Sequence, residues 1–69
     1  MITNYVVSGM TCNHCVHAVQ EEVSNVEGVS EVSVTLDGGR MQVNSLRPID
    51  LADIADAVSE AGDYSVAEL

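Results

Sequence analysis

The stretch that decides the fold is TNYVVSGMTCNHCVHAVQEEVSNV, residues 3–26. Its first part, residues 3–8, is rich in β-branched residues and alternates, with Tyr5 and Val7 on one face. Such alternation predicts a half-buried strand. Gly9 interrupts the pattern, and the next few residues read as a loop. A strand that gives way abruptly to a different period indicates a mixed α and β architecture.

The second part of this stretch predicts a helix that begins at His14. Its apolar residues recur at helical spacing, at Val16, Val19, Val23 and Val26. Thr11 or Asn13 is expected to cap the helix at its start, and Gly28 to end it. Because valine has a low helix propensity, packing of this stripe must hold the helix in place.

A hairpin follows the first helix. Residues 32–36 alternate, with their apolar members on one side, and Asp37-Gly38-Gly39 is a hairpin turn signal. The return strand places Met41 and Val43 inward, where Met41 fills the core and binds no metal. Residues 45–49 are expected to form a loop.

A second helix and a final strand complete the pattern. Asp50 is the expected helix cap, and Asp53 three residues later forms a variant of the capping box. Gly62 ends the helix, and residues 64–69 form the last strand. The buried stripe of this helix is expected to consist of Leu51, Ile54, Val58 and Ala61.

The order strand, helix, strand, strand, helix, strand predicts an α+β fold. Four antiparallel strands with two helices on one face bury both apolar layers. The 69 residues are expected to form one domain, spanning residues 1–69. A domain this small buries only about 60% of the surface of its unfolded chain and has little room for a deep cleft. We therefore expect a surface binding site and a protein that is not an enzyme.

The net charge is −9, from eleven acidic residues against Arg40 and Arg47, with no lysine. Nucleic acids and anionic membrane surfaces are excluded as partners, because both require basic groups. A basic protein surface is favoured. An acidic run along the second helix, Asp50, Asp53, Asp56 and Glu60, is expected to be a solvated face and at most a docking surface.

Targeting signals are missing from the given chain. No run of about 18 apolar residues is present, and residues 1–4 do not resemble a secretory signal. We therefore expect a cytoplasmic protein. In a reducing compartment, Cys12 and Cys15, three positions apart, are expected to bind metal or to be redox-active.

Chemistry concentrates in Cys12-Asn13-His14-Cys15. The first cysteine lies in the predicted loop and the second in the first helical turn, where exposed amides and the helix dipole favour thiolates. Two thiolates suit a soft ion, and monovalent copper fits better than zinc, whose structural sites use four ligands. A mercury carrier with the same thiols and a dithiol redox pair remain alternatives.

The motif Gly9-Met10-Thr11-Cys12-Asn13-His14-Cys15 resembles the G-M-T-C-x-x-C signature of the heavy-metal-associated domain family. The strand and helix order and the closing Ala61-Gly62 before an aromatic residue extend this resemblance over nearly the whole chain. Within the family, the chain is similar to bacterial cytosolic copper chaperones of the CopZ type. The resemblance implies a ferredoxin-like open sandwich, Cu(I) bound by Cys12 and Cys15, and copper transfer to the metal-binding domain of a copper-exporting P-type ATPase.

The resemblance also implies roles for residues around the thiols. Met10 supports the loop without binding metal, and Tyr64 shields the site. A neutral Thr11 favours copper over divalent zinc or cadmium, whose carriers in this family often have an aspartate there. The chain departs from the family where Asp63 separates Gly62 from Tyr64, a difference of one residue.

The chain also has no lysine near the site, where many relatives keep one to offset the charge of the copper dithiolate. His14 is a possible third ligand, a possible group beside the thiolates, or a solvent-exposed residue, whereas His17 is expected to face solvent. Exposed thiolates also predict a copper-bridged homodimer. An isolated metal-binding domain of a metal-transporting ATPase remains an alternative.

Overall fold

The computed structural model describes all residues from Met1 to Leu69. Four strands, two α-helices and one short 3₁₀ turn follow one another along the chain. Their bounds are β1 (Ile2–Ser8), α1 (Asn13–Ser24), β2 (Val29–Val34), η1 (Asp37–Gly39), β3 (Arg40–Ser45), α2 (Leu51–Ala61) and β4 (Ser65–Glu68).

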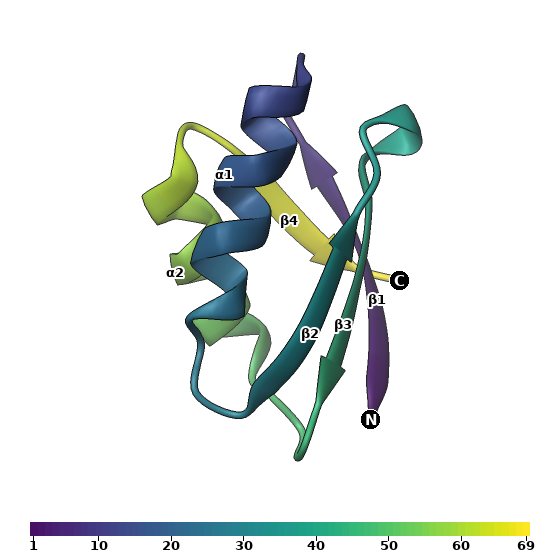
Figure 1. Ribbon diagram of the computed structural model, residues 1–69, viewed down its shortest axis with the longest axis vertical. Coiled ribbons are helices and arrows are strands. Elements are labelled where there is room, and N and C mark those ends of the chain that lie inside the picture. The colour runs from purple at the N-terminus through teal and green to yellow at the C-terminus, as the bar shows by residue number, and fades with distance from the viewer.

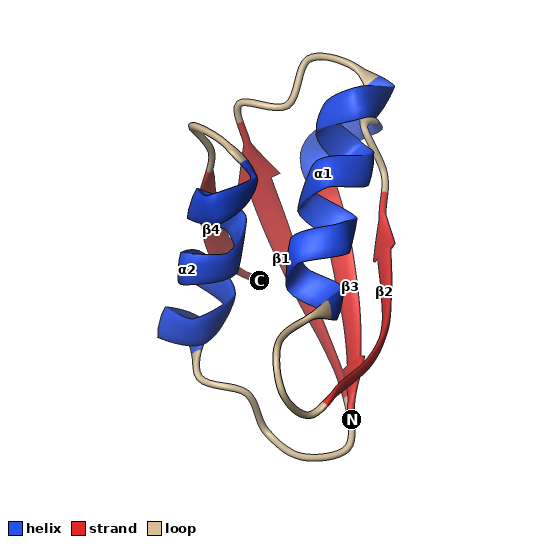
Figure 2. Ribbon diagram, turned by 60° about the vertical axis from the view of Figure 1, so that its left-hand side comes forward, coloured by secondary structure: helices blue, strands red, loops and turns tan.

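The four strands form one sheet in the order β2-β3-β1-β4, and every neighbouring pair is antiparallel. Both helices lie on the same face of this sheet (Figures 1 and 2). The arrangement is the ferredoxin-like α+β sandwich that the element order predicted. The other face of the sheet carries no helix, which makes the sandwich open.

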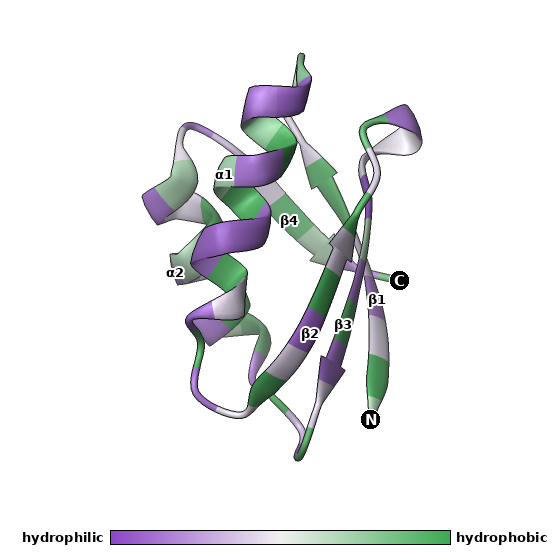
Figure 3. Cartoon of the chain, viewed as in Figure 1, coloured by the Kyte–Doolittle hydropathy of each residue, from purple (hydrophilic) through white to green (hydrophobic).

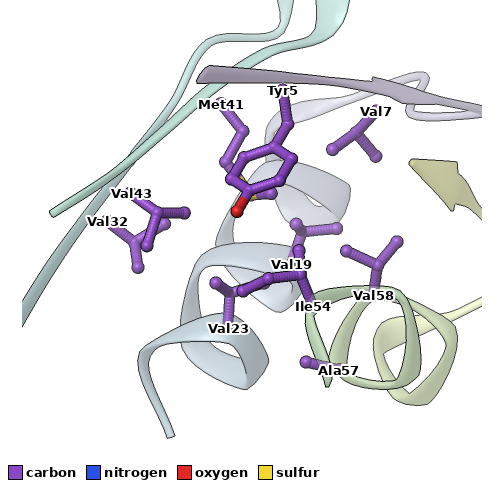
Figure 4. Packing of buried hydrophobic residues seen from close by; sticks show 10 residues of the cluster. All are labelled: Tyr5, Val7, Val19, Val23, Val32, Met41, Val43, Ile54, Ala57 and Val58. Carbon is purple, nitrogen blue, oxygen red and sulfur yellow. The ribbon is translucent and has the colours of Figure 1, made fainter. Parts of the chain in front are cut away.

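The core lies between the helices and the sheet. Its largest fully buried side chains include Tyr5 and Met41 from the two central strands and Ile54 from α2. Figure 4 shows these side chains converging, together with valines from both layers. In Figure 3 the solvent side of each helix is hydrophilic. The placement of Tyr5, Val7, Met41 and Val43 on the inner face is therefore confirmed.

Helix α1 is shorter than the valine pattern suggested. Val16, Val19 and Val23 are buried as expected, but the helix ends at Ser24 with Asn25 as its C-cap. The expectation that Gly28 ends it was wrong, because the backbone leaves the helix one turn earlier. Gly28 instead adopts a left-handed conformation, with φ of 93°, where the chain turns into β2.

Helix α2 begins and ends where the sequence indicated, but two details differ. Asp50 is its N-cap residue, yet its side chain makes no capping hydrogen bond, so the expected capping box with Asp53 does not form. Leu51 is exposed, and Ala57 takes its place beside Ile54 on the buried face. Leu51 is the first residue of α2, and the buried stripe of the helix begins one turn later, at Ile54.

The Asp37-Gly38-Gly39 hairpin is confirmed, although it closes through the 3₁₀ turn η1. The outermost residue of the preceding alternation, Leu36, lies beyond β2 and is exposed, contrary to the pattern. Gly39 packs tightly against β1: a methyl group on it would lie 2.2 Å from the carbonyl oxygen of Val7. This contact fixes the hairpin beside the end of β1.

Two connections meet at one end of the molecule. The loop from β1 to α1 and the loop from α2 to β4 lie at the same end of the sandwich in both ribbon views (Figures 1 and 2). Strand β4 begins at Ser65, so Tyr64 belongs to the second of these loops. Neither helix has the length and the apolar content that a membrane span requires.

Candidate metal centre

The two cysteines lie where the chain passes from loop to helix. Cys12 is the N-cap residue of α1, in extended conformation, and its carbonyl oxygen accepts the first helical hydrogen bonds, from the amides of Cys15 and Val16. Neither Thr11 nor Asn13 caps the helix, and no side chain does. As expected, Cys12 lies at the end of the loop and Cys15 lies in the first turn of the helix.

The fold brings the two thiol groups together. The Sγ atoms of Cys12 and Cys15 lie 3.6 Å apart, and both cysteines are free thiols. Cys12 is exposed, whereas Cys15 is partly covered. The hydroxyl of Thr11 lies 4.0 Å from the sulfur of Cys15. The two sulfurs are close enough to share one ion, and Cys12, being exposed, is open to a second molecule.

The environment of Cys15 favours its thiolate. Its pKa is lowered from 9.0 to about 6, chiefly by the backbone N–H of Thr11, which donates a hydrogen bond to the sulfur. The side chains of Tyr64 and Cys12 contribute next, and desolvation opposes them. The amide with the largest effect on this pKa therefore belongs to the loop before the helix, whereas the sequence indicated the exposed amides at the start of the helix itself. The thiolate is the form that binds a soft metal ion.

Tyr64 stands beside Cys15 despite the additional Asp63. The pKa of its phenol is raised, first because the hydroxyl acts as hydrogen-bond donor to the sulfur of Cys15. The backbone absorbs the extra residue in a tight turn, in which the amide of Tyr64 donates to the carbonyl oxygen of Gly62 at 2.9 Å. The one-residue departure from the family spacing thus leaves the phenol at the thiol end of the molecule.

Sequence reasoning did not identify two glycines in this neighbourhood. Gly9 and Gly62 both lie against the ring of Tyr64. A methyl group added to Gly9 would lie 3.2 Å from a ring carbon, and one added to Gly62 would lie 2.8 Å from another. Gly9 stood in the signature motif and Gly62 was expected only to end a helix. No spacing in the sequence signals that the two glycines face the same ring, because they lie 53 positions apart.

The remaining candidates lie around the thiols without joining them. Met10 is partly buried and packs against the core, whereas His14 and His17 are exposed. The structure contains no group of three or more histidine, cysteine or acidic side chains placed to hold a metal ion. Met41 is fully buried in the core, as expected. The two sulfurs are thus the donor pair that the fold brings together.

The largest surface groove lies away from the thiols, between the C-terminal end of α1 and the outer side of α2. It is lined mainly by acidic residues, among them Glu22, Asp53, Asp56 and Glu60. Arg47 enters it and pairs with Glu27 at 3.6 Å, both side chains being largely exposed. The acidic run of α2 is therefore a solvated surface, and the groove contains neither cysteine.

Comparison with known proteins places this geometry in a family. Residues 5–63 match the model of the heavy-metal-associated domain. The chain is 43% identical over 63 residues to the copper chaperone CopZ of Bacillus subtilis (strain 168), covering 90% of each chain. It is 41% identical over 56 residues to the COP-associated protein of Helicobacter felis, covering 81% of this chain and 85% of the relative.

A solved structure supports the same assignment. The fold matches the crystal structure of a copper-binding domain from HMA7, a P-type ATPase, with a TM-score of 0.87 and 31% identity. The match covers 99% of this chain and 92% of the other. Similar sequences and a shared fold extend over almost the whole chain. The chain therefore belongs to the heavy-metal-associated domain family.

Proposed function

We propose that this protein is a cytoplasmic carrier of monovalent copper that holds the ion between Cys12 and Cys15 and delivers it to another protein. It is not an enzyme: the copper is cargo and leaves unchanged. The observation that carries the proposal is the pair of sulfurs 3.6 Å apart at an exposed helix start. Similarity to copper chaperones over 90% of the chain supports the same conclusion.

The donor set favours Cu(I) over harder or more highly coordinated ions. Thiolates select soft ions such as Cu(I), and a closed structural zinc site uses four protein ligands. Here no third donor is grouped with the thiols. Thr11, beside Cys15, adds no carboxylate. We therefore propose a two-coordinate site, in which Met10 supports the loop from the core side and His14 does not bind the ion.

Copper is transferred by exchange of ligands. A thiolate of the acceptor forms a bond to copper while Cys12 and Cys15 still hold it, which gives a three-coordinate intermediate. The bond from Cys12, the more exposed ligand, breaks next. A second acceptor thiolate then displaces Cys15. Over the whole exchange two copper–sulfur bonds form and two break, copper stays monovalent, and any proton lost by an entering thiol passes to a departing one.

The acceptor we propose is the metal-binding domain of a copper-transporting P-type ATPase. A domain of that class has the same fold as this chain, so two equivalent loops can meet face to face. The same geometry allows a copper-bridged homodimer at high protein concentration. Both complexes are weak and transient, as carriage of an ion requires.

A copper titration tests the proposal. Reduced protein is titrated anaerobically with Cu(I) in competition with a chelator of known affinity, beside the Cys12→Ser variant and a Zn²⁺ titration. Tight binding of one Cu(I), much stronger than that of Zn²⁺ and lost in the variant, supports the proposal. Transfer is then followed by loading the protein, mixing it with an isolated ATPase metal-binding domain and separating the two by ion exchange.

Two other results would contradict the carrier hypothesis. Weak Cu(I) binding together with tight Hg²⁺ binding would indicate a mercury carrier. Weak metal binding together with catalysed reduction of insulin disulfides would indicate a dithiol oxidoreductase.

A further inference from the structure

The ring of Tyr64 lies against the backbone of Gly62. A methyl group placed on Gly62 would lie 2.8 Å from Cε2, 3.1 Å from Cζ and 3.3 Å from the hydroxyl oxygen of Tyr64. These atoms form the far end of the side chain and include the hydroxyl, the group that hydrogen-bonds Cys15. Gly9 borders the near end, where an added methyl group would lie 3.2 Å from Cδ1. The ring therefore occupies a slot between two glycines.

The backbone at Gly62 does not itself require glycine. Its φ of 160° and ψ of −165° describe an extended conformation that any residue adopts. Gly9, by contrast, has a φ of +103°, which disfavours every other residue. What Gly62 provides is therefore space: without a side chain there, the phenol can fold back over the turn that Asp63 creates.

We propose that Gly62 is a positioning residue of the copper site, which acts by leaving the phenol of Tyr64 room to stand against Cys15. This inference rests on the proposed function. A side chain at position 62 pushes the flexible end of the ring away from the sulfur and leaves the backbone in place. Cys15 then loses a hydrogen-bond donor and part of its cover, whereas Cys12 is unaffected.

The position of Tyr64 gives the two thiolates different tasks. Tyr64 covers Cys15, so this sulfur holds copper while Cys12 exchanges with the entering ligand. Gly62 maintains that asymmetry, and it compensates for Asp63, which would otherwise carry the tyrosine one residue past the site. The additional residue and the glycine before it thus function as one unit.

The experiment combines Gly62→Ala, Tyr64→Phe and the double variant in one cycle. Each single change is expected to weaken Cu(I) binding by about threefold to tenfold, the loss of one hydrogen bond to the ligand. The double variant is expected to bind no more weakly than Tyr64→Phe alone, since Gly62 acts only through the hydroxyl. Losses that multiply in the double variant would overturn the proposal, as would wild-type affinity in Gly62→Ala.

A second measurement needs no metal. In wild-type protein, proton NMR is expected to show contacts between the ring protons of Tyr64 and the β protons of Cys15, and these contacts are expected to disappear in Gly62→Ala. Their persistence would refute the positioning role. If the wild-type protein bound no copper, the proposed function would fail, while this measurement would still decide where the ring lies.

A matched control is Gly38→Ala in the hairpin. Gly38 has a φ of +76° and only one neighbouring atom within 4 Å of an added methyl group, 3.9 Å away on Arg40. This variant is expected to lower the denaturation midpoint and keep wild-type copper affinity. Gly62→Ala is expected to keep the wild-type denaturation midpoint and to weaken Cu(I) binding. A loss of both stability and affinity in both variants would indicate a merely structural role.

Discussion

The core and the thiol end of this protein differ in how far their side chains are exposed to solvent. In the core, Tyr5, Met41 and Ile54 are at most 1% exposed. At the thiol end, Cys12 is exposed and Cys15 is only partly covered. The core holds the fold by burial of apolar surface, and none of its fully buried side chains belongs to the candidate site. The side chains that form the buried core and the side chains that carry the chemistry are therefore different.

One residue joins the two regions. Met10 stands in the loop of the cysteines, yet it packs partly buried against the core. The hairpin turn makes a similar link, because Gly39 lies against the backbone of β1 just before that loop. The thiol loop is thus held at its base, while its tip stays accessible to another protein.

The largest expected effect is at the thiol end. Replacing both Cys12 and Cys15 by serine is expected to abolish tight Cu(I) binding, since no other donors are grouped there. At pH 5, where the thiolate of Cys15 no longer contributes, stability is expected to change by less than about 0.5 kcal/mol, because neither cysteine is buried. Chemical denaturation at pH 5, where Cys15 is protonated in both states, checks the second part. A large loss of stability there would break the separation between core and site.

The converse change lies in the core. Ile54→Ala is expected to destabilise the protein by about 2–5 kcal/mol, because the cavity adds to the lost burial. Ile54→Val is expected to cost about 1 kcal/mol and to leave the Cu(I) affinity of the folded protein unchanged. Denaturation curves and copper competition on the same samples measure both quantities. Weaker copper binding in Ile54→Val would show that the core tunes the site.

A dependence on pH distinguishes the two regions further. Since the pKa of Cys15 falls from 9.0 in the ordinary thiol to about 6 in the fold, the thiolate stabilises the folded state fully above pH 9. This contribution is lost as the pH falls from 9 through 6. Cu(I) affinity is expected to drop below pH 6, where a proton competes for the sulfur.

Denaturation of the metal-free protein between pH 5 and 9 tests this dependence, with Cys15→Ser as control. The variant is expected to lack the thiolate part of the pH profile. Thiolate absorbance at 240 nm gives the titration directly. A midpoint near the ordinary value of 9.0 would show that the amide of Thr11 does not stabilise the charged sulfur.

The smallest expected effect concerns His14. Its side chain is exposed and belongs to no group of three donors. His14→Ala is therefore expected to change Cu(I) affinity by no more than about twofold, the usual range for an exposed position. His17→Ala, also on an exposed part of α1, serves as the matched control. A loss of about 100-fold in His14→Ala alone would identify His14 as a ligand.

The sequence by itself determined the architecture and the chemistry. Alternation at Tyr5 and Val7, helical spacing at Val16 and Val19, and the turn signal at Asp37-Gly38-Gly39 are local patterns. Each follows from the period of side chains along a strand or a helix. The cysteine pair was equally visible, because two cysteines three positions apart at the start of a helix place their side chains at the same end of it.

Other features were decided only by tertiary structure. Leu51 is exposed and Ala57 is buried because of how α2 packs against the other layer, and α1 ends at Ser24 because the chain turns, with Gly28 at positive φ, before it enters β2. Local helix propensity predicts neither which residue is buried nor where the helix ends. The valine pattern continues to Val26, which packs against the core from outside the helix.

The setting of Cys15 is the clearest case. Its sulfur is surrounded by Thr11 from its own loop and by Tyr64 from a connection 49 positions later. Gly9 and Gly62, also distant in sequence, shape the space for that tyrosine. These groups meet because β1 and β4 pair antiparallel, so that β1 ends at Ser8 directly beside Ser65, where β4 begins. The sequence names the ligands, but the pairing of strands decides what surrounds them.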